Sequence, residues 1–175
     1  SGATKYFYVI GVAVGGSTTT VTVTGGSDFS LSNAAISAPC LSKAASPAGF
    51  PDWMSWSPAF SASGSMTLTS VSIVIAKFKI FGRELRIIVS ANGVTGGTAD
   101  KGFQFDLPFP VYFASQIALA AWAIDGGPWV GAVGALTSTS QVSVFKYDSS
   151  NFGIGNSRSI RVNGSLIKLR EKLGY

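Results

Sequence analysis

The stretch MTLTSVSIVIAKFKIFGRELRIIV, residues 66–89, decides the fold class of this chain. Val71, Ile73 and Ile75 occupy one parity, and after Ala76 the apolar positions switch to the other parity at Phe78 and Ile80. A period of two is typical of β-strands, so the stretch predicts two antiparallel strands joined by a turn at Gly82. The change of parity predicts a bulge, a kink or a strand break near Ala76.

The composition favours the same fold class. Charged residues make up only 12% of the 175 residues, Gly occupies 21 positions, and Glu84 and Glu171 are the only glutamates. Helical proteins normally carry many Glu and Lys side chains on their solvated faces, so a helix bundle is excluded. The length fits one ordinary domain, or one domain with a small appendage.

Strand-like segments separated by turns fill most of the chain. The first hairpin is predicted by residues 6–12 and 19–24, which flank Gly15-Gly16-Ser17. Asn92-Gly93 predicts the opening of a loop that ends at Phe103. The later segments that predict strands are Gln116–Asp125, Gly131–Leu136, Gln141–Tyr147 and Ser159–Leu169. This pattern predicts an all-β chain with an antiparallel β-sandwich, a jelly roll of two packed sheets, preceded by a small N-terminal β-hairpin module.

Prolines at positions 47, 51 and 58 mark the junction between these two parts, because proline lacks the N–H group that a central strand needs. We therefore expect an N-terminal hairpin and attachment module over residues 1–52 and a head domain over residues 53–175. Phe50, Trp53 and Trp56 lie in this junction and are predicted to hold the module on the head. Residues 166–173 have roughly helical spacing, but a frayed end after the last strand is equally compatible with them.

The composition also excludes several chemistries. The chain has no histidine, so catalytic triads with histidine and histidine-ligated zinc sites are impossible within it. Cys40 is the single cysteine and has no such base to activate it. No phosphate-binding loop is present, and no apolar run approaches the roughly 20 residues that span a bilayer. We predict no cofactor, no metal site and no membrane insertion.

The net charge of +5 arises from scattered basic residues rather than from one cluster. Scattered Lys and Arg side chains are typical of a solvated surface, and we predict no nucleic-acid partner. The alternative left open is an anionic partner, such as an acidic polysaccharide.

Two pairs of aspartates are the only candidates for glycoside hydrolysis: Asp100 with Asp106, and Asp125 with Asp148. Each lies at a strand end or in a turn, where aspartate routinely caps backbone N–H groups. Turn chemistry is therefore the favoured interpretation, and we predict no catalytic residues and no enzyme.

The aromatic residues supply the best candidate ligand site. Trp129 follows Gly126-Gly127-Pro128 in a predicted loop, where an aromatic platform for a saccharide is conceivable. Its expected companions are Asp125, Tyr147, Asp148 and Asn151, and simple packing of these residues is the alternative. Trp122 shares its parity with alanines and is expected in the core or at a subunit interface.

Several segments resemble a known protein family. They are Tyr6–Ile10, Thr20–Phe29, Ser46–Trp53, Phe78–Leu85, Thr95–Thr98 and Phe105–Pro110. They are similar to the heads of bacteriophage tail-fibre and virion-surface proteins and to the module that precedes those heads. The resemblance implies a jelly roll like that of the complement and tumour-necrosis-factor family, assembly as a homotrimer, and location on the virion, at a fibre tip or on the capsid surface. It implies no catalytic residue.

The leading hypothesis is therefore a non-enzymatic virion structural protein, the trimeric receptor-binding head of a tail fibre, with a host cell-surface saccharide or protein as its partner. The alternative is a capsid decoration protein that grips capsid or tail proteins of the same virion through its hairpin and residues 49–56. A polysaccharide-degrading enzyme and a cellular carbohydrate-binding or cytokine-like module are less favoured.

Overall fold

The computed structural model describes residues 4–44, 47–111 and 117–167, and over these residues the chain is all-β with no helix. A two-stranded sheet contains β1 (Tyr8–Gly15) and β2 (Thr18–Thr24). A larger antiparallel sheet contains β3 (Met54–Ser55), β4 (Phe60–Ala62), β5 (Met66–Phe81), β6 (Glu84–Gly97), β7 (Gly102–Asp106), β8 (Ala118–Asp125), β9 (Trp129–Ser138), β10 (Gln141–Lys146) and β11 (Gly155–Ile167). The predicted all-β class with an N-terminal hairpin is confirmed.

The turns follow the predicted glycines. The β1–β2 turn places Gly16 at φ +54°, and the β5–β6 turn places Gly82 at φ +59°, a region that glycine enters without a steric cost. The pairing of β5 with β6 shifts register between Thr69 and Ser72 and again between Ile73 and Ile75. The parity change near Ala76 is therefore a bulge, and β5 continues through it.

The predicted loop at Asn92-Gly93 is wrong, because β6 continues as far as Gly97. In this part of the chain β6 pairs with β5 on one side and with β11 on the other. The backbone hydrogen bonds of these two pairings outweigh the low strand preference of glycine. The glycine at position 93 has a packing reason: a Cβ atom added to it would lie 2.8 Å from Cδ1 of Leu68.

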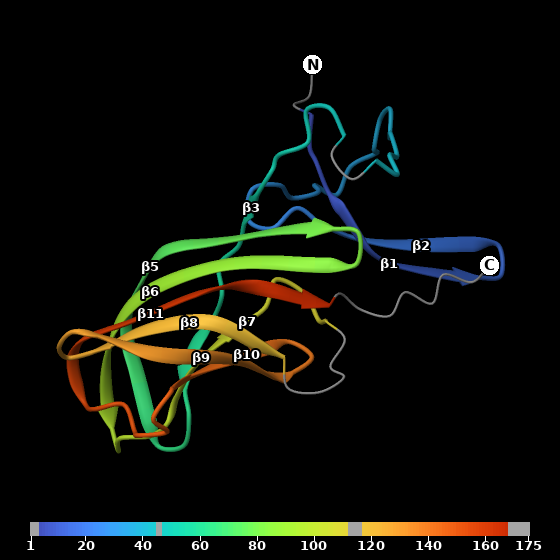
Figure 1. Cartoon of the computed structure of the whole chain (residues 1–175). Coiled ribbons are helices and arrows are strands. Elements are labelled where there is room, and N and C mark those ends of the chain that lie inside the picture. The colour runs from blue at the N-terminus through green and yellow to red at the C-terminus, as the bar shows by residue number, and fades with distance from the viewer. Residues whose placement is uncertain (1–3, 45–46, 112–116, 168–175) are drawn as a thin grey trace.

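The larger sheet curls until one short segment joins its two edges (Figure 1). Its strand order is β3-β5-β6-β11-β8-β9-β10-β7-β4, so the edge strands β3 and β4 both belong to residues 54–62. The N–H of Trp56 donates to the carbonyl of Ala76 in β5 (3.2 Å), and the N–H of Asp106 in β7 donates to the carbonyl of Ala59 (3.1 Å). The two packed sheets that we expected are thus two halves of one continuous sheet.

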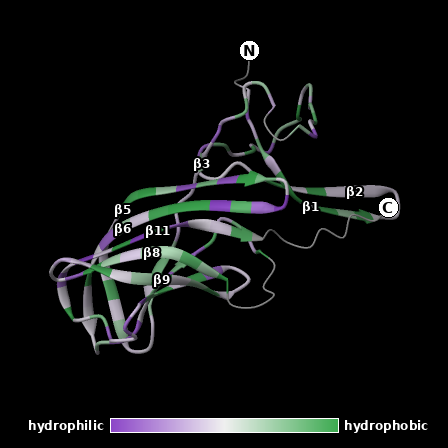
Figure 2. Ribbon diagram, in the orientation of Figure 1, coloured by the Kyte–Doolittle hydropathy of each residue, from purple (hydrophilic) through white to green (hydrophobic). Residues whose placement is uncertain are grey.

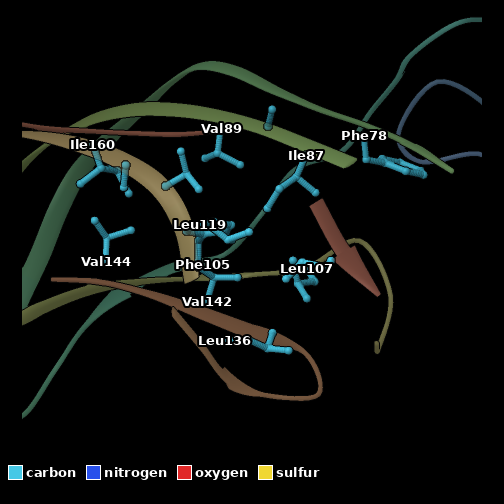
Figure 3. Packing of buried hydrophobic residues seen from close by; sticks show 14 of the residues in the cluster. Phe78, Ile87, Val89, Phe105, Leu107, Leu119, Leu136, Val142, Val144 and Ile160 are labelled. Carbon is cyan, nitrogen blue, oxygen red and sulfur yellow. The ribbon is translucent and has the colours of Figure 1, made fainter. Parts of the chain in front are cut away.

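The core fills the inside of this curl. Figure 3 shows Val89 of β6 and Ile160 of β11 on one side, with Phe105 of β7 and Val144 of β10 opposite them. All four side chains are buried, as are the other members of the cluster. Burial of each such side chain contributes about 1.5–3 kcal/mol, so inward-facing residues of distant strands hold the curl closed.

The junction residues Phe50, Trp53 and Trp56 lie between the hairpin and this core, and their role in attachment stays a prediction. Trp56 is buried, its ring lies 5.9 Å from that of Phe78, and its indole N–H donates to the carbonyl of Asp106 (3.2 Å). Phe50 packs its ring 4.8 Å from that of Tyr8 at the base of the hairpin. Trp53 is half-buried, with the ammonium group of Lys79 5.3 Å from its ring centre.

The boundary between residues 52 and 53 stays a prediction, because packing continues across it. The carboxylate of Asp28 accepts a hydrogen bond from the N–H of Ser55 (2.6 Å), and the N–H of Ser27 donates to the carbonyl of Ser55 (2.7 Å). At the other end of the chain, β11 extends to Ile167. Most of the segment with helical spacing lies outside the described residues.

Replacement of Trp56 by alanine should lower the free energy of unfolding by about 3 kcal/mol or more, because it leaves a cavity where residues 54–62 join the sheet edges. Trp53→Ala is the matched control, and its half-exposed side chain predicts a loss of about 1 kcal/mol or less. Denaturant unfolding measures both. Equal losses for the two variants would contradict the role given to Trp56.

Candidate functional site

The outer face of β8 presents a tryptophan to solvent. Leu119, Ala121 and Ala123 point inward and are buried, so the alternating residues point outward. Trp122 belongs to this outward set and keeps 50% of its surface exposed. A core position for Trp122 is therefore wrong, because the strand turns the opposite parity toward the core. Its expected place at a subunit interface stays a prediction.

Trp129 lies on the same outer face. We expected it in a loop, but it is the first residue of β9 and pairs with Ile124 of β8, so the loop prediction is wrong. The turn is confined to residues 126–128, where Gly126 adopts φ +75°. Trp129 is 48% exposed, and the guanidinium carbon of Arg161 lies 4.8 Å from its ring centre. That stacked arginine restrains the ring of Trp129.

A glycine leaves space between the exposed aromatic residues. Gly131 pairs with Trp122 across β8 and β9, and its carbonyl accepts a hydrogen bond from the N–H of Tyr147 (3.0 Å). The Cβ atom of Tyr147 lies 3.7 Å from where a Cβ atom of Gly131 would be, so Tyr147 begins on this same face. We call Trp122, Trp129, Gly131, Tyr147 and Arg161 together the outer platform.

An open groove of about 430 Å³ adjoins the outer platform. Its lining residues are Ser70, Asn92, Gly93, Val94, Ile124, Ser157, Arg158 and Ser159. Register places the two features side by side, because Ile124 pairs with Trp129 on one side and with Ser159 on the other. The groove lies where β5 and β11 are irregular, with Ser70 at φ +50° and Ser157 at φ +60°.

Hydroxyl and amide groups supply the polar chemistry of the groove. The hydroxyl of Ser159 donates to the side-chain oxygen of Asn92 (2.6 Å). Within the described part of the chain, the amide nitrogen of Asn92 makes no hydrogen bond, so it is available as a donor to a ligand. Neutral donors and acceptors beside exposed aromatic rings suit a polar ligand with apolar faces.

Asp125, a predicted ligand residue, is held by internal ion pairs. Its carboxylate lies 2.8 Å from the ammonium group of Lys146 and 3.0 Å from Nε of Arg158, and it accepts the N–H of Gly153 (2.9 Å). Burial raises the pKa of Asp125, but the hydrogen bonds from Lys146 and Gly153 and the two cations outweigh burial and leave the pKa below its ordinary value. Asp125 therefore fixes the connection between β10 and β11.

Asp148 and Asn151 also make internal bonds in that connection. Asp148 accepts hydrogen bonds from the hydroxyl (2.7 Å) and the N–H (2.9 Å) of Ser150, which hold its pKa below the usual range. The side-chain amide of Asn151 donates to the carbonyl of Ala99 (3.1 Å). Of the predicted site residues, the structure thus brings Trp129 and Tyr147 to one surface and uses Asp125, Asp148 and Asn151 to shape the loop.

Sequence reasoning did not assign Asn92, Ser159 or Arg161 to this surface, and it placed Trp122 in the core or at a subunit interface instead of among the ligand residues. Ser159 and Arg161 share one parity of β11, which is a signal for a polar face. Only the register of β11 against β6 and β8, which pairs Ser159 with Asn92 and Arg161 with Trp122, shows which residues they join.

Among the residues that the structure describes, no three Cys, Asp or Glu side chains gather as a metal site would require. The same residues contain no helix long and apolar enough to cross a membrane. No protein-family model, no curated protein and no solved structure matches the chain.

Replacement of Asp125 by asparagine should lower the free energy of unfolding at neutral pH by about 3 kcal/mol, because it leaves Lys146 and Arg158 without their anion. The folded-state pKa of Asp125 is lowered, so its contribution is present above about pH 4 and is lost as the pH falls through the folded-state value. The variant should therefore lose less stability on acidification than the parent.

Denaturant unfolding between pH 7 and pH 3 measures both effects. The control is Asp106→Asn, at an exposed strand end that none of the ion pairs in the described residues includes. An Asp125 variant with the parent's stability at neutral pH would contradict the structural role given to this carboxylate.

Proposed function

We propose that this chain is a non-enzymatic saccharide-binding head that serves in adhesion to a cell surface. The observation that carries the proposal is the outer platform beside the groove. Two half-exposed tryptophans and the exposed Tyr147 flank a glycine on a rigid sheet, and hydroxyl and amide groups line the adjoining hollow.

This combination suits a sugar. A sugar ring has an apolar face of C–H groups that packs on an aromatic ring, and its hydroxyls need several donors and acceptors at the edge. The groove of about 430 Å³ is open to solvent, so it can contact part of a longer chain of sugars. Trp122, Trp129 and Ser159 stand on paired strands, so little backbone conformational entropy is lost on binding.

The virion setting of this proposal rests on the resemblance of the hairpin, junction and head segments to tail-fibre heads. That resemblance also supports a homotrimer, as does the apolar content of the surface. Trp122 and Trp129 on the head, and Val14 on the hairpin, leave large apolar surfaces in water. Threefold assembly would present three platforms and raise the apparent affinity for a dense surface glycan.

A second candidate function, capsid decoration, is favoured by the hairpin. Residues 6–27 contain no charged side chain, and Figure 2 shows the hairpin without strongly hydrophilic segments. Val12, Val14 and Val21 share one face of it and are 43%, 79% and 50% exposed. In Figure 1 the hairpin extends beyond the β5–β6 turn, so this face is available to another protein of the particle.

Trp122→Ala and Trp129→Ala should each weaken binding to host-surface glycan several-fold, because each removes a stacking face worth on the order of 1 kcal/mol. Phe81→Ala is the matched control: Phe81 is 52% exposed, at the end of β5 and away from the platform. Glycan-array and cell-adsorption measurements test all three variants, with melting curves to confirm the fold.

Parent-like adsorption by both tryptophan variants would refute the proposed site. Release of reducing ends from host polysaccharide by the parent would refute the non-enzymatic assignment.

The chain should also assemble as a homotrimer at micromolar concentration. Native mass spectrometry or light scattering would show this state, and an 18 kDa monomer would overturn it. Val14→Lys, which places a charge on the most exposed valine of the hairpin, should weaken the particle attachment required of a decoration protein but leave glycan binding intact. Parent-like occupancy of the capsid by this variant would count against decoration through the hairpin.

A further inference from the structure

We infer that the saccharide taken by the outer platform and the groove is acidic, a sugar ring with a carboxylate, and that Arg161 pairs with that carboxylate. The inference rests on the proposed saccharide-binding function and adds the chemical class of the ligand. Its starting point is the charge balance of this face.

Arg161 is a cation for which the described residues supply no anion. It is exposed, and none of the ion pairs within residues 4–44, 47–111 and 117–167 includes it. The residues paired with it in register are Ser90 of β6 and Trp122 of β8, which carry no charge. Arg86 and Arg158, by contrast, pair with Glu84 and Asp125.

The position of Arg161 is fixed before any ligand arrives. The carbon of its guanidinium group lies 4.8 Å from the ring centre of Trp129. A guanidinium group that packs its flat face on an aromatic ring keeps its N–H donors at the edge of the plane for a further partner. A guanidinium edge matches a carboxylate with two parallel hydrogen bonds, whereas a neutral hydroxyl uses one of them.

The groove adds no competing negative charge. Its lining contains no carboxylate, and its one charged residue, Arg158, donates to the carbonyls of Gly153, Ile154 and Asn156 as well as pairing with Asp125. Lys146 and Arg158 meet Asp125, and Lys146 also interacts with Asp148, so the charges of these four groups balance. The charge left uncompensated beside the groove by the described residues is therefore that of Arg161, and it favours an anionic ligand.

Neutral parts of the same sugar would be recognised by the remaining groups. The ring would stack on the exposed face of Trp122 above Gly131, and its hydroxyls would reach Ser159 and Asn92 across the groove. Arg161 pairs in register with Trp122 and follows Ser159 on the same face of β11, so one saccharide of two or three units can contact all of these groups.

The test uses oligomers of galacturonate, glucuronate and mannuronate, each paired with its carboxyl-reduced neutral form, against the full-length chain. At least one uronate oligomer should bind the parent about tenfold more tightly than its reduced form, in line with one charge-assisted pair. Arg161→Gln should abolish that preference, and Arg161→Lys should restore part of it. Raised salt should weaken the uronate complex more than the neutral one.

Arg83→Gln is the matched control, since it removes the same charge from the exposed β5–β6 turn. Equal loss of uronate binding in the Arg83 and Arg161 variants would reduce the effect to net charge and overturn the inference. Equal binding of acidic and reduced oligomers by the parent would overturn the acidic class and leave the saccharide proposal standing. If the parent binds none of the oligomers, the inference is overturned. The proposed function is tested separately by cell adsorption, and parent-like adsorption by the Trp122 and Trp129 variants would refute it.

Discussion

The structure depends on the double pairing of residues 54–62. The first part of this segment pairs with β5 and the last part pairs with β7, which are far apart in the order of the sheet. An open sheet of this length would leave one face of every strand in water, whereas a segment bound at both edges forces the sheet to curl around its own apolar face. Trp56 stands between the two pairings, and its hydrogen bond to Asp106 links the junction to β7.

The curl also explains where the candidate ligand surface lies. Strong curvature requires bulges, and the register shifts of β5 and β11 occur beside the groove. The inner face is filled by the core, so the outward residues of β8 and β9 are not needed to close the sheet. Exposed tryptophans at Trp122 and Trp129 are therefore unexplained by folding alone, which is the physical reason to look for a ligand or a neighbouring subunit on that face.

The sequence was sufficient for features that depend on local chemistry. Parity predicted most of the long strands and an irregularity near Ala76, for which a bulge, a kink and a strand break were all open, and Gly16 and Gly82 predicted their hairpin turns. The sequence was insufficient where pairing with another strand determines whether a residue lies in a strand or in a loop. Pairing with β11 kept β6 extended through Asn92 and Gly93, and pairing with Ile124 brought Trp129 into β9 instead of a loop. The register of the strands brings Arg161 to the ring of Trp129. Asp125 and Asp148, the acidic residues expected beside Trp129 from the sequence, make internal hydrogen bonds instead.

The same geometry explains why some charged side chains form internal ion pairs and another lies on the outer surface. Asp125 comes at the end of β8, where Lys146 of β10 and Arg158 of β11 meet it, and these pairs anchor the connection that borders the groove. Arg161, three residues after Arg158 in β11, lies on the outer face, and no ion pair within the part of the chain that the structure describes includes it. One strand therefore supplies an arginine that stabilises the fold and an arginine that is free for an anionic partner. Because their side chains differ in burial and in partners, ligand recognition can change at Arg161 without loss of the ion pairs that hold the loop.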